Sequence, residues 1–124
     1  MASQPTNAEL DILRHLWKEK EATVRDINQS LNQTSEKEIG YTTTLKIMQI
    51  MHEKGLVKRR KQGKTHFYTA NIDEKETQNS LLDRLIDTAF SGSAMNMVVQ
   101  ALGHRKTSPE ELEAIRKFLD QMEE

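Results

Sequence analysis

The sequence GYTTTLKIMQIMHEKG, residues 40–55, decides the fold. Apolar side chains recur in it at the three-residue spacing of a helix with one buried face, at Leu45, Met48 and Met51, and Ile47 and Ile50 lie on the neighbouring stripe. Hydrogen-bonding side chains fall on the opposite face: Thr42, Lys46, Gln49 and Glu53. Gly55 is a stop signal, because glycine readily adopts the left-handed conformation that ends many helices. The stretch therefore predicts a helix with an apolar back and a polar front.

Two shorter amphipathic stretches precede this helix. Residues 7–20 predict a helix capped by Asn7, and residues 23–31 predict a second helix in which Thr23 and Asp26 resemble a capping box. The expected buried stripes are Leu10, Leu13 and Trp17 in the first helix, and Val24, Ile27 and Leu31 in the second. A polar turn over residues 33–38 follows. Three helices in this order indicate a helix-turn-helix unit.

A short hairpin is predicted directly after the third helix. Residues 56–60 and 65–70 are typical of strands, and the second run is rich in β-branched and aromatic side chains. Gly63 supplies the turn between them. Basic side chains cluster over about residues 58–66: Lys58, Arg59, Arg60, Lys61 and Lys64. A helix-turn-helix followed by such a hairpin is a winged helix, and an ordinary hairpin with a solvated tip is the alternative interpretation.

Charge is distributed unevenly along the chain. The net charge is −1, yet residues 1–70 carry 12 Lys and Arg against 8 Asp and Glu, whereas residues 71–124 carry 6 against 11. A basic N-terminal part favours contact with a polyanion such as nucleic acid, and the acidic remainder indicates a different task. A merely solvated charge run is the alternative interpretation of the basic cluster taken alone.

Several function classes are excluded by what the sequence lacks. The absence of cysteine excludes a disulfide framework, a zinc finger and thiol catalysis. The four histidines lack metal-ligand spacing and no nucleophile or phosphate-loop motif occurs, so we expect no enzyme, no metal and no cofactor. No apolar run approaches the roughly 18 residues of a membrane span, and the N-terminal residues lack the pattern of a signal peptide. We therefore expect a cytoplasmic protein without membrane contact.

Three further amphipathic helices are predicted after the hairpin. They run over about residues 73–90, over residues 94–102 with Gly103 as the stop, and from an N-cap at Ser108 with Pro109 in the first position. Their apolar faces contain Leu82, Leu85, Ile86, Phe90, Val98, Leu102, Leu112, Ile115, Leu119 and Met122. These helices either fold back on the N-terminal unit or pair with a second copy of the chain. Their acidic surface favours pairing, so residues 71–124 are predicted to form a dimerisation domain.

The predicted winged helix, residues 1–70, suggests a way to bind DNA. The major groove admits a helix, and its base edges offer hydrogen-bond donors, acceptors and thymine methyl groups. On a recognition helix over about residues 41–54, the expected contacts are Tyr41, Thr42, Thr43, Thr44, Lys46 and Gln49. On the hairpin, the cations expected to contact phosphates without reading sequence are Arg59, Arg60, Lys61 and Lys64.

In these residues the chain resembles the penicillinase repressor family of winged-helix transcription repressors, the BlaI and MecI type. The resemblance is carried by TNAELDILRHLWKEKEATVRDI, by IGYTTTLKIMQIMHEKGLVKRRKQGKTHFYTA and by the three-helix tail. It implies a mainly α fold with a small β-hairpin wing, in which a winged helix-turn-helix precedes a C-terminal helical dimerisation domain. It also implies a homodimer that binds inverted-repeat operators in double-stranded DNA and blocks transcription.

Two departures from the family leave the inducing signal open. Resistance repressors of this family are inactivated by cleavage of an Asn-Phe bond in the short tail helix, where this chain has Gln100 and Ala101. Copper-responsive relatives carry cysteine pairs near the C-terminus, and this chain has no cysteine. The partner that relieves repression, whether a signalling protease or a ligand, is therefore unknown from the sequence.

Two other functions are compatible with the same fold. One is a winged helix that docks a protein, and the other is a ligand-sensing regulator whose signal is unknown. The basic wing and the hydroxyl-rich helix start favour DNA over a protein partner. The Met side chains of the tail are better explained as fillers of core gaps than as ligands.

Overall fold

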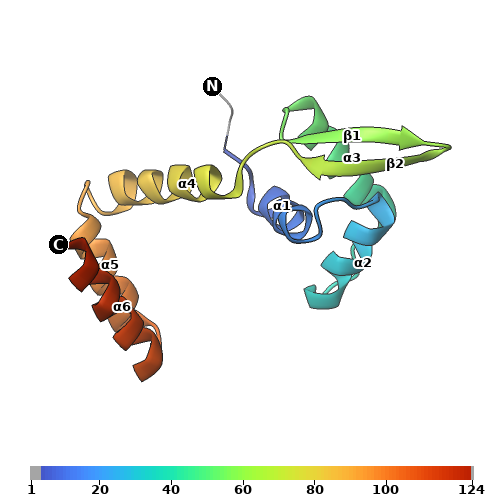
Figure 1. Cartoon of the computed structure of the whole chain (residues 1–124). Helices are drawn as coiled ribbons and strands as arrows, with labels where there is room; N and C mark the ends of the chain where they lie inside the picture. The colour runs from blue at the N-terminus through green and yellow to red at the C-terminus, as the bar shows by residue number, and fades with distance from the viewer. Residues whose placement is uncertain (1–3, 124) are drawn as a thin grey trace. The chain divides into compact units, whose positions relative to one another are not determined.

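The computed structural model describes residues 4–123, which form six helices and one antiparallel hairpin (Figure 1). In chain order the elements are α1 (Asn7–Glu19), α2 (Val24–Thr34), α3 (Tyr41–Glu53), β1 (Val57–Gln62), β2 (Thr65–Ala70), α4 (Glu74–Ala89), α5 (Ala94–His104) and α6 (Pro109–Met122). Among the described residues, no helix combines the length and the apolar character needed to cross a membrane.

The chain divides into two compact units, one ending at Leu81 and the other beginning at Leu82. The first unit extends beyond the hairpin into the first turns of α4. Trp17 Nε1 donates a hydrogen bond to the carbonyl oxygen of Ile72 (3.0 Å), and Thr77 is buried. The predicted domain boundary after residue 70 therefore falls inside this unit.

A single hydrophobic core holds the first unit together. Its fully or nearly fully buried side chains come from α1, α2, α3, the hairpin and the connections between them: Ile12, Leu13, Leu16, Ala22, Val24, Ile27, Met48, Met51, Leu56, Val57 and Tyr68. Trp17 is only partly buried and packs against this cluster rather than within it. The buried face of α3 thus packs against α1, α2 and the hairpin, and its opposite face is exposed.

Side-chain caps fix the starts of α1 and α2. Thr6, not the predicted Asn7, caps α1, and it forms a capping box in which the Glu9 amide donates to Thr6 Oγ1 (3.2 Å). The cap of α2 agrees with the prediction, since Thr23 and Asp26 form the second capping box. α2 continues through polar side chains to Thr34, beyond its predicted end at Leu31, where the apolar stripe stops.

The hairpin is joined to the helices on one edge. β1 and β2 pair in an antiparallel register that sets Arg59 opposite Tyr68 and Arg60 opposite Phe67, and the turn contains Gly63 at φ +62°. β2 also exchanges two backbone hydrogen bonds with Ala22, of 3.0 Å and 2.8 Å. The connection between α1 and α2 is therefore joined to the hairpin by one bridge at Ala22.

Helix ends in the remaining chain follow the predicted signals with one exception. Gly55 adopts a positive φ of +81° just beyond α3, and Ser108 caps α6 by accepting from the Glu111 amide (3.0 Å), as predicted. Gly103 does not end α5, because its φ is not positive and the helix continues to His104. A glycine near a helix end is a stop only when the backbone turns left-handed there.

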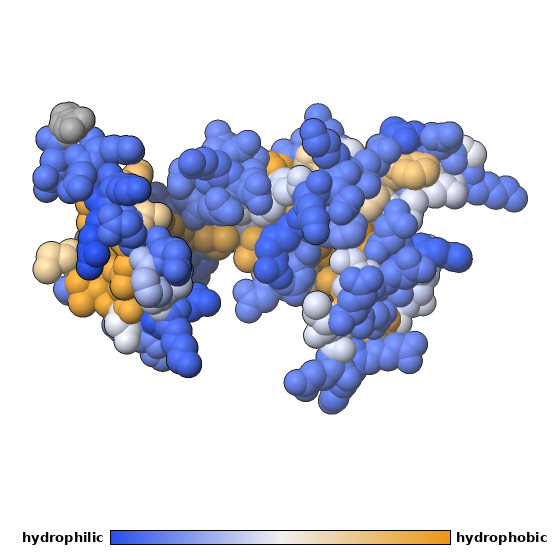
Figure 2. All heavy atoms as spheres, turned by 60° about the horizontal axis from the view of Figure 1, so that its bottom comes forward, coloured by the Kyte–Doolittle hydropathy of each residue, from blue (hydrophilic) through white to orange (hydrophobic). Residues whose placement is uncertain are grey.

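The second unit has a different surface from the first. None of its described side chains, residues 82–123, is fully buried. Large apolar side chains are exposed on all three helices: Leu82, Leu85, Met95, Val98, Val99, Phe118, Leu119 and Met122. Figure 2 shows hydrophobic residues at the surface of this unit. A single copy of these helices therefore leaves exposed the apolar surface whose burial would stabilise it.

Candidate nucleic-acid interface

The free face of α3 carries most of the side chains predicted to meet DNA. Thr42, Thr43, Lys46 and Gln49 are exposed, and Tyr41 at the helix start is 50% exposed. These groups project away from the core formed by Met48 and Met51 on the opposite face. Hydroxyl, amide and ammonium groups are therefore presented together on one helical surface, which is the chemistry that base edges and phosphates recognise.

Thr44 is an exception, and its prediction as a DNA contact is wrong. Its side chain is fully buried (0% exposed), and its Oγ1 accepts a hydrogen bond from Asn28 Nδ2 at 3.0 Å. Thr44 lies four residues before Met48 and thus on the same buried side of α3. The helical period separates it from Thr42 and Thr43, although the three form one block in the sequence.

Ile50 is an apolar side chain on the exposed part of α3. It lies on the stripe beside the one that carries Leu45, Met48 and Met51, and it is 39% exposed. It follows Thr43 and Lys46 at helical spacing and therefore lies on the stripe that those two residues begin. An apolar group on this face is suited to contact a thymine methyl group.

The N-terminal end of α3 is open to an anion. Gly40 is its N-cap and provides no side-chain cap, and the first turn contains no acidic residue. Backbone amides at such an end lack partners within the helix and carry a partial positive charge. The acidic Glu53 lies at the other end of α3. The electrostatics therefore favour an approach of phosphates at the N-terminal end.

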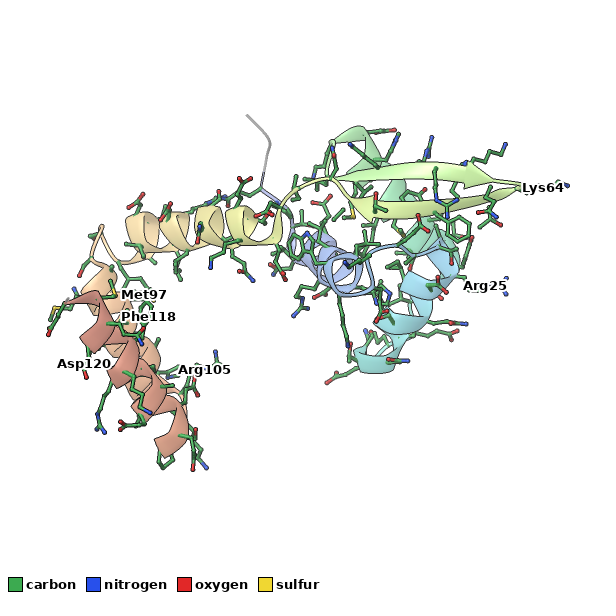
Figure 3. The ribbon with its side chains drawn as sticks, in the orientation of Figure 1. Arg25, Lys64, Met97, Arg105, Phe118 and Asp120 are labelled. Carbon is green, nitrogen blue, oxygen red and sulfur yellow. The ribbon has the colours of Figure 1, made fainter. Side chains whose placement is uncertain are left out.

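The cations of the wing lie on two faces. Side chains alternate along a strand, so Arg59 and Lys61 share the face of buried Tyr68, whereas Arg60 projects on the other side. Lys64 extends from the tip of the hairpin, as Figure 3 shows. Arg59, Lys61 and Lys64 are exposed. Cations thus line the wing up to its tip on more than one side.

Arg60 is already paired within the protein. Its Nε and Nη2 donate to the two carboxylate oxygens of Glu21, each at 2.8 Å, and its guanidinium carbon lies 4.5 Å from the centre of the Phe67 ring. The hydrogen bonds from Arg60 lower the pKa of Glu21, and the same pair raises the pKa of Arg60. Arg60 therefore tethers the wing to the connection before α2, and its charge is largely matched by Glu21.

The sequence of this chain matches the family described as "Penicillinase repressor" over residues 5–121. The chain belongs to the penicillinase repressor family. The match confirms the resemblance seen in the sequence, and it covers both the winged unit and the C-terminal helices.

Curated members of the penicillinase repressor family resemble the chain over nearly its whole length. It is 25% identical to the penicillinase repressor of Bacillus licheniformis over 95% of this chain and 91% of that protein. It is 26% identical to the transcriptional regulator BlaI of Mycobacterium tuberculosis over 90% and 80%, and 20% identical to the methicillin resistance regulatory protein MecI of Staphylococcus aureus over 93% and 92%. The family is one of transcription regulators, so the chain is not an enzyme, as predicted.

Two solved structures of the penicillinase repressor family share the fold of part of this chain. The DNA-binding domain of the repressor BlaI matches 61% of this chain and 90% of its own length at 26% identity, with a TM-score of 0.53. Bacillus licheniformis BlaI in its monomeric form, in complex with the blaP half-operator, matches the same shares at 26% identity and a TM-score of 0.51. These likenesses confirm a mainly helical fold built on a winged helix-turn-helix.

The residues predicted to form a dimer seam lie on the three C-terminal helices of this penicillinase repressor family member, except Phe90, which directly follows α4. Exposed among them are Leu82, Leu85, Val98, Leu119 and Met122. Partly buried are Ile86, Phe90, Leu102, Leu112 and Ile115. Gln100 and Ala101 of α5 are both exposed.

Two features of the candidate interface were not predicted from the sequence. Arg25 is an exposed cation in the first turn of α2 and extends from that helix (Figure 3). The first helix of a helix-turn-helix crosses the DNA backbone, so the position of Arg25 was a usable signal. The second feature is the hydrogen-bonding of Asn28 and Asn32 beneath α3, for which residue type alone gives no signal.

No cluster of three or more metal-ligating His, Cys, Asp or Glu side chains occurs within residues 4–123.

Proposed function

We propose that the protein is a homodimeric repressor that places α3 in the major groove of an inverted-repeat operator and rests its wing on the phosphates. The observation that carries this proposal is a start of α3 without a side-chain cap or a first-turn acid, together with an exposed polar face and an adjacent basic hairpin. A relative 26% identical in sequence forms a complex with an operator half-site, which supports the same partner for this chain.

Sequence reading would fall to the outward side chains of α3. Thr42 and Thr43 can donate or accept a hydrogen bond and can set a methyl group against thymine, while Gln49 can pair with adenine through its amide. Lys46 can reach a guanine edge or a phosphate. Tyr41 lies at the open N-terminal end, where its hydroxyl and the first backbone amides can hold one phosphate.

Affinity that does not depend on sequence would come from the wing. Each phosphate neutralised by Lys or Arg releases condensed counterions, which makes binding weaken as salt rises. Arg59, Lys61 and Lys64 are exposed and suited to this role. Arg60 is less suited, since Glu21 already occupies its guanidinium group.

Dimerisation would follow from the unburied apolar surface of the second unit. Residues 82–123 contain no fully buried side chain, although they form helices with apolar faces. A second copy would cover these faces and would hold two winged units on one DNA duplex. Two half-sites separated by about one helical turn, or a multiple of it, would then be bound with the gain in affinity that tethering provides.

The test is selection of bound duplexes from a random pool by the full-length protein, followed by fluorescence anisotropy titrations. We expect enrichment of an inverted repeat and tighter binding to it than to a scrambled duplex of the same composition. A protein that enriches no sequence and binds all duplexes alike at low salt would contradict the proposal. If the protein enriches no DNA sequence but binds another protein, a protein-docking winged helix is favoured instead.

A further inference from the structure

A network of side-chain amides holds the segment that leads into α3. Asn32 Oδ1 accepts from the Ile39 amide at 2.7 Å, and Asn32 Nδ2 donates to the Ile39 carbonyl oxygen at 3.0 Å. Asn28 Nδ2 donates to the same carbonyl oxygen at 2.9 Å and to Thr44 Oγ1 at 3.0 Å. Asn32 Nδ2 also lies 3.0 Å from the carbonyl oxygen of Asn28. Both backbone polar groups of Ile39 are therefore bound by side chains of α2.

The location of this network gives it a consequence for α3. Ile39 directly precedes Gly40, the N-cap of α3, which has no side chain to fix the helix start. Thr44 lies in the first turns of the same helix and is fully buried. The side-chain amides of Asn28 and Asn32 thus bind Ile39, just before the start of α3, and that of Asn28 also binds Thr44 within α3. These bonds join the start of α3 to α2.

We propose that Asn28 and Asn32 are positioning residues that set the pose of α3 in the operator without touching DNA. The inference rests on the proposed function, in which Thr42 and Thr43 at the same end of α3 read bases. Contacts to base edges depend on alignment within a fraction of an ångström, so the support beneath them decides their quality. Long lysine and arginine side chains on the wing can follow a small displacement, so phosphate contacts depend on this support much less.

The network therefore acts on discrimination between sequences more than on affinity for DNA in general. If the support is removed, the start of α3 shifts and the base contacts weaken, whereas the wing still binds phosphates. Specific and non-specific affinities should then converge. A residue that only stabilises the fold has a different effect, because loss of folded protein weakens binding to every duplex by the same factor.

The test measures the ratio of two dissociation constants by fluorescence anisotropy at low temperature, using full-length protein. One duplex is the sequence that the wild-type protein enriches from a random pool, and the other is its scramble. The variants are Asn28→Ala, Asn32→Ala and Thr44→Val, with Thr44→Ser as the variant that keeps the hydroxyl group. Gln33→Ala is the matched control, since Gln33 is an exposed residue of the same helix.

We expect the ratio to fall by about tenfold in the first three variants, comparable to the loss caused by one mismatched base pair. The salt dependence of binding to the scramble should stay as in the wild type, and Thr44→Ser and Gln33→Ala should keep the wild-type ratio. The ratio does not depend on the folded fraction, and three variants enter the network independently, so one that folds poorly does not remove the answer.

Unchanged ratios in Asn28→Ala, Asn32→Ala and Thr44→Val would overturn the inference while leaving the proposed function intact. An equal fall for Gln33→Ala would also overturn it, because the effect would then not belong to the network. If the wild-type protein enriches no sequence, the proposed function itself fails and the inference fails with it.

Discussion

Lys54 Nζ lies 2.9 Å from each carboxylate oxygen of Glu9, which ties the C-terminal end of α3 to the first turn of α1. Glu9 is only 3% exposed and also accepts a hydrogen bond from the Thr6 amide at 2.9 Å. Burial opposes ionisation of this carboxyl group, but the hydrogen bonds from Lys54 and Thr6 outweigh it and lower the pKa of Glu9. One carboxylate therefore fixes the start of one helix and the end of another.

Replacement of Glu9 by glutamine should destabilise the protein. The amide keeps the shape of the side chain and can still accept from Thr6, but it offers no charge to Lys54. Because Lys54 stays partly solvated, we expect the free energy of unfolding at pH 7 to fall by about 1–2 kcal/mol. Urea denaturation followed by circular dichroism measures the change, and Glu19→Gln, at the exposed end of α1, should have little effect.

The same pair should make stability depend on pH. A carboxyl group whose pKa is lower in the folded protein stabilises it fully above the ordinary value of 4.5, and this contribution is lost as pH falls through the lower folded value. The difference in stability between wild type and Glu9→Gln should therefore shrink as the pH is lowered from 6 to 3. A difference that stays constant over this range would mean that folding does not lower the pKa of Glu9.

Thr42 and Thr44 should differ in their contribution to stability. Thr42 is exposed, so Thr42→Ala should change the free energy of unfolding by less than about 0.5 kcal/mol while weakening operator binding by about 1 kcal/mol or more. Thr44→Ala removes a buried acceptor from Asn28, so it should cost about 1–3 kcal/mol of stability. Thermal unfolding and anisotropy titrations on the same samples give both quantities. Equal effects on stability would contradict the assignment of the two residues to opposite faces.

Local signals in the sequence were sufficient for the elements of the winged unit. The period of the apolar residues predicted α3, and a left-handed Gly55 ends it as expected. The Thr6 cap was also legible, since Thr6 and Glu9 have the spacing of a capping box, but the neighbouring Asn7 offered an equally good cap by residue type. Thr44 was misassigned because the threonine block was interpreted by composition rather than by the 3.6-residue period.

Contacts between distant residues could not be predicted in the same way. Glu21 and Arg60 meet only because Ala22 pairs with β2, which brings the connection after α1 beside the wing. Asn28 and Asn32 are ordinary polar residues of α2 until the turn brings Ile39 over them. Electrostatic pairing and positioning therefore depend on tertiary structure, whereas the face of α3 follows from its period.

Lys64 and Arg60 should contribute unequally to the salt dependence of DNA binding. Lys64 extends from the hairpin tip, so Lys64→Ala should weaken binding to every duplex and reduce the slope of log affinity against log salt by about one (Figure 3). Arg60→Ala should change the slope less, because the charge of Arg60 is matched by Glu21. Titrations at salt concentrations from about 50 to about 200 mM provide the slopes. A larger change for Arg60→Ala would mean that DNA displaces Glu21 from the guanidinium group.

A charged residue in the apolar seam of α6 should separate the two copies of the chain. Leu119 is 53% exposed in a single copy, so Leu119→Glu should leave the winged unit folded but place a carboxylate within the proposed dimer interface. We expect analytical ultracentrifugation to report a monomer at micromolar concentration and operator affinity to fall by about a hundredfold, since the second half-site loses its tether. Gln121→Glu is the matched control, because it adds the same charge at an exposed polar position of the same helix. A Leu119→Glu protein that stays dimeric, or that binds the operator as tightly as the wild type, would show that this seam does not join the two copies.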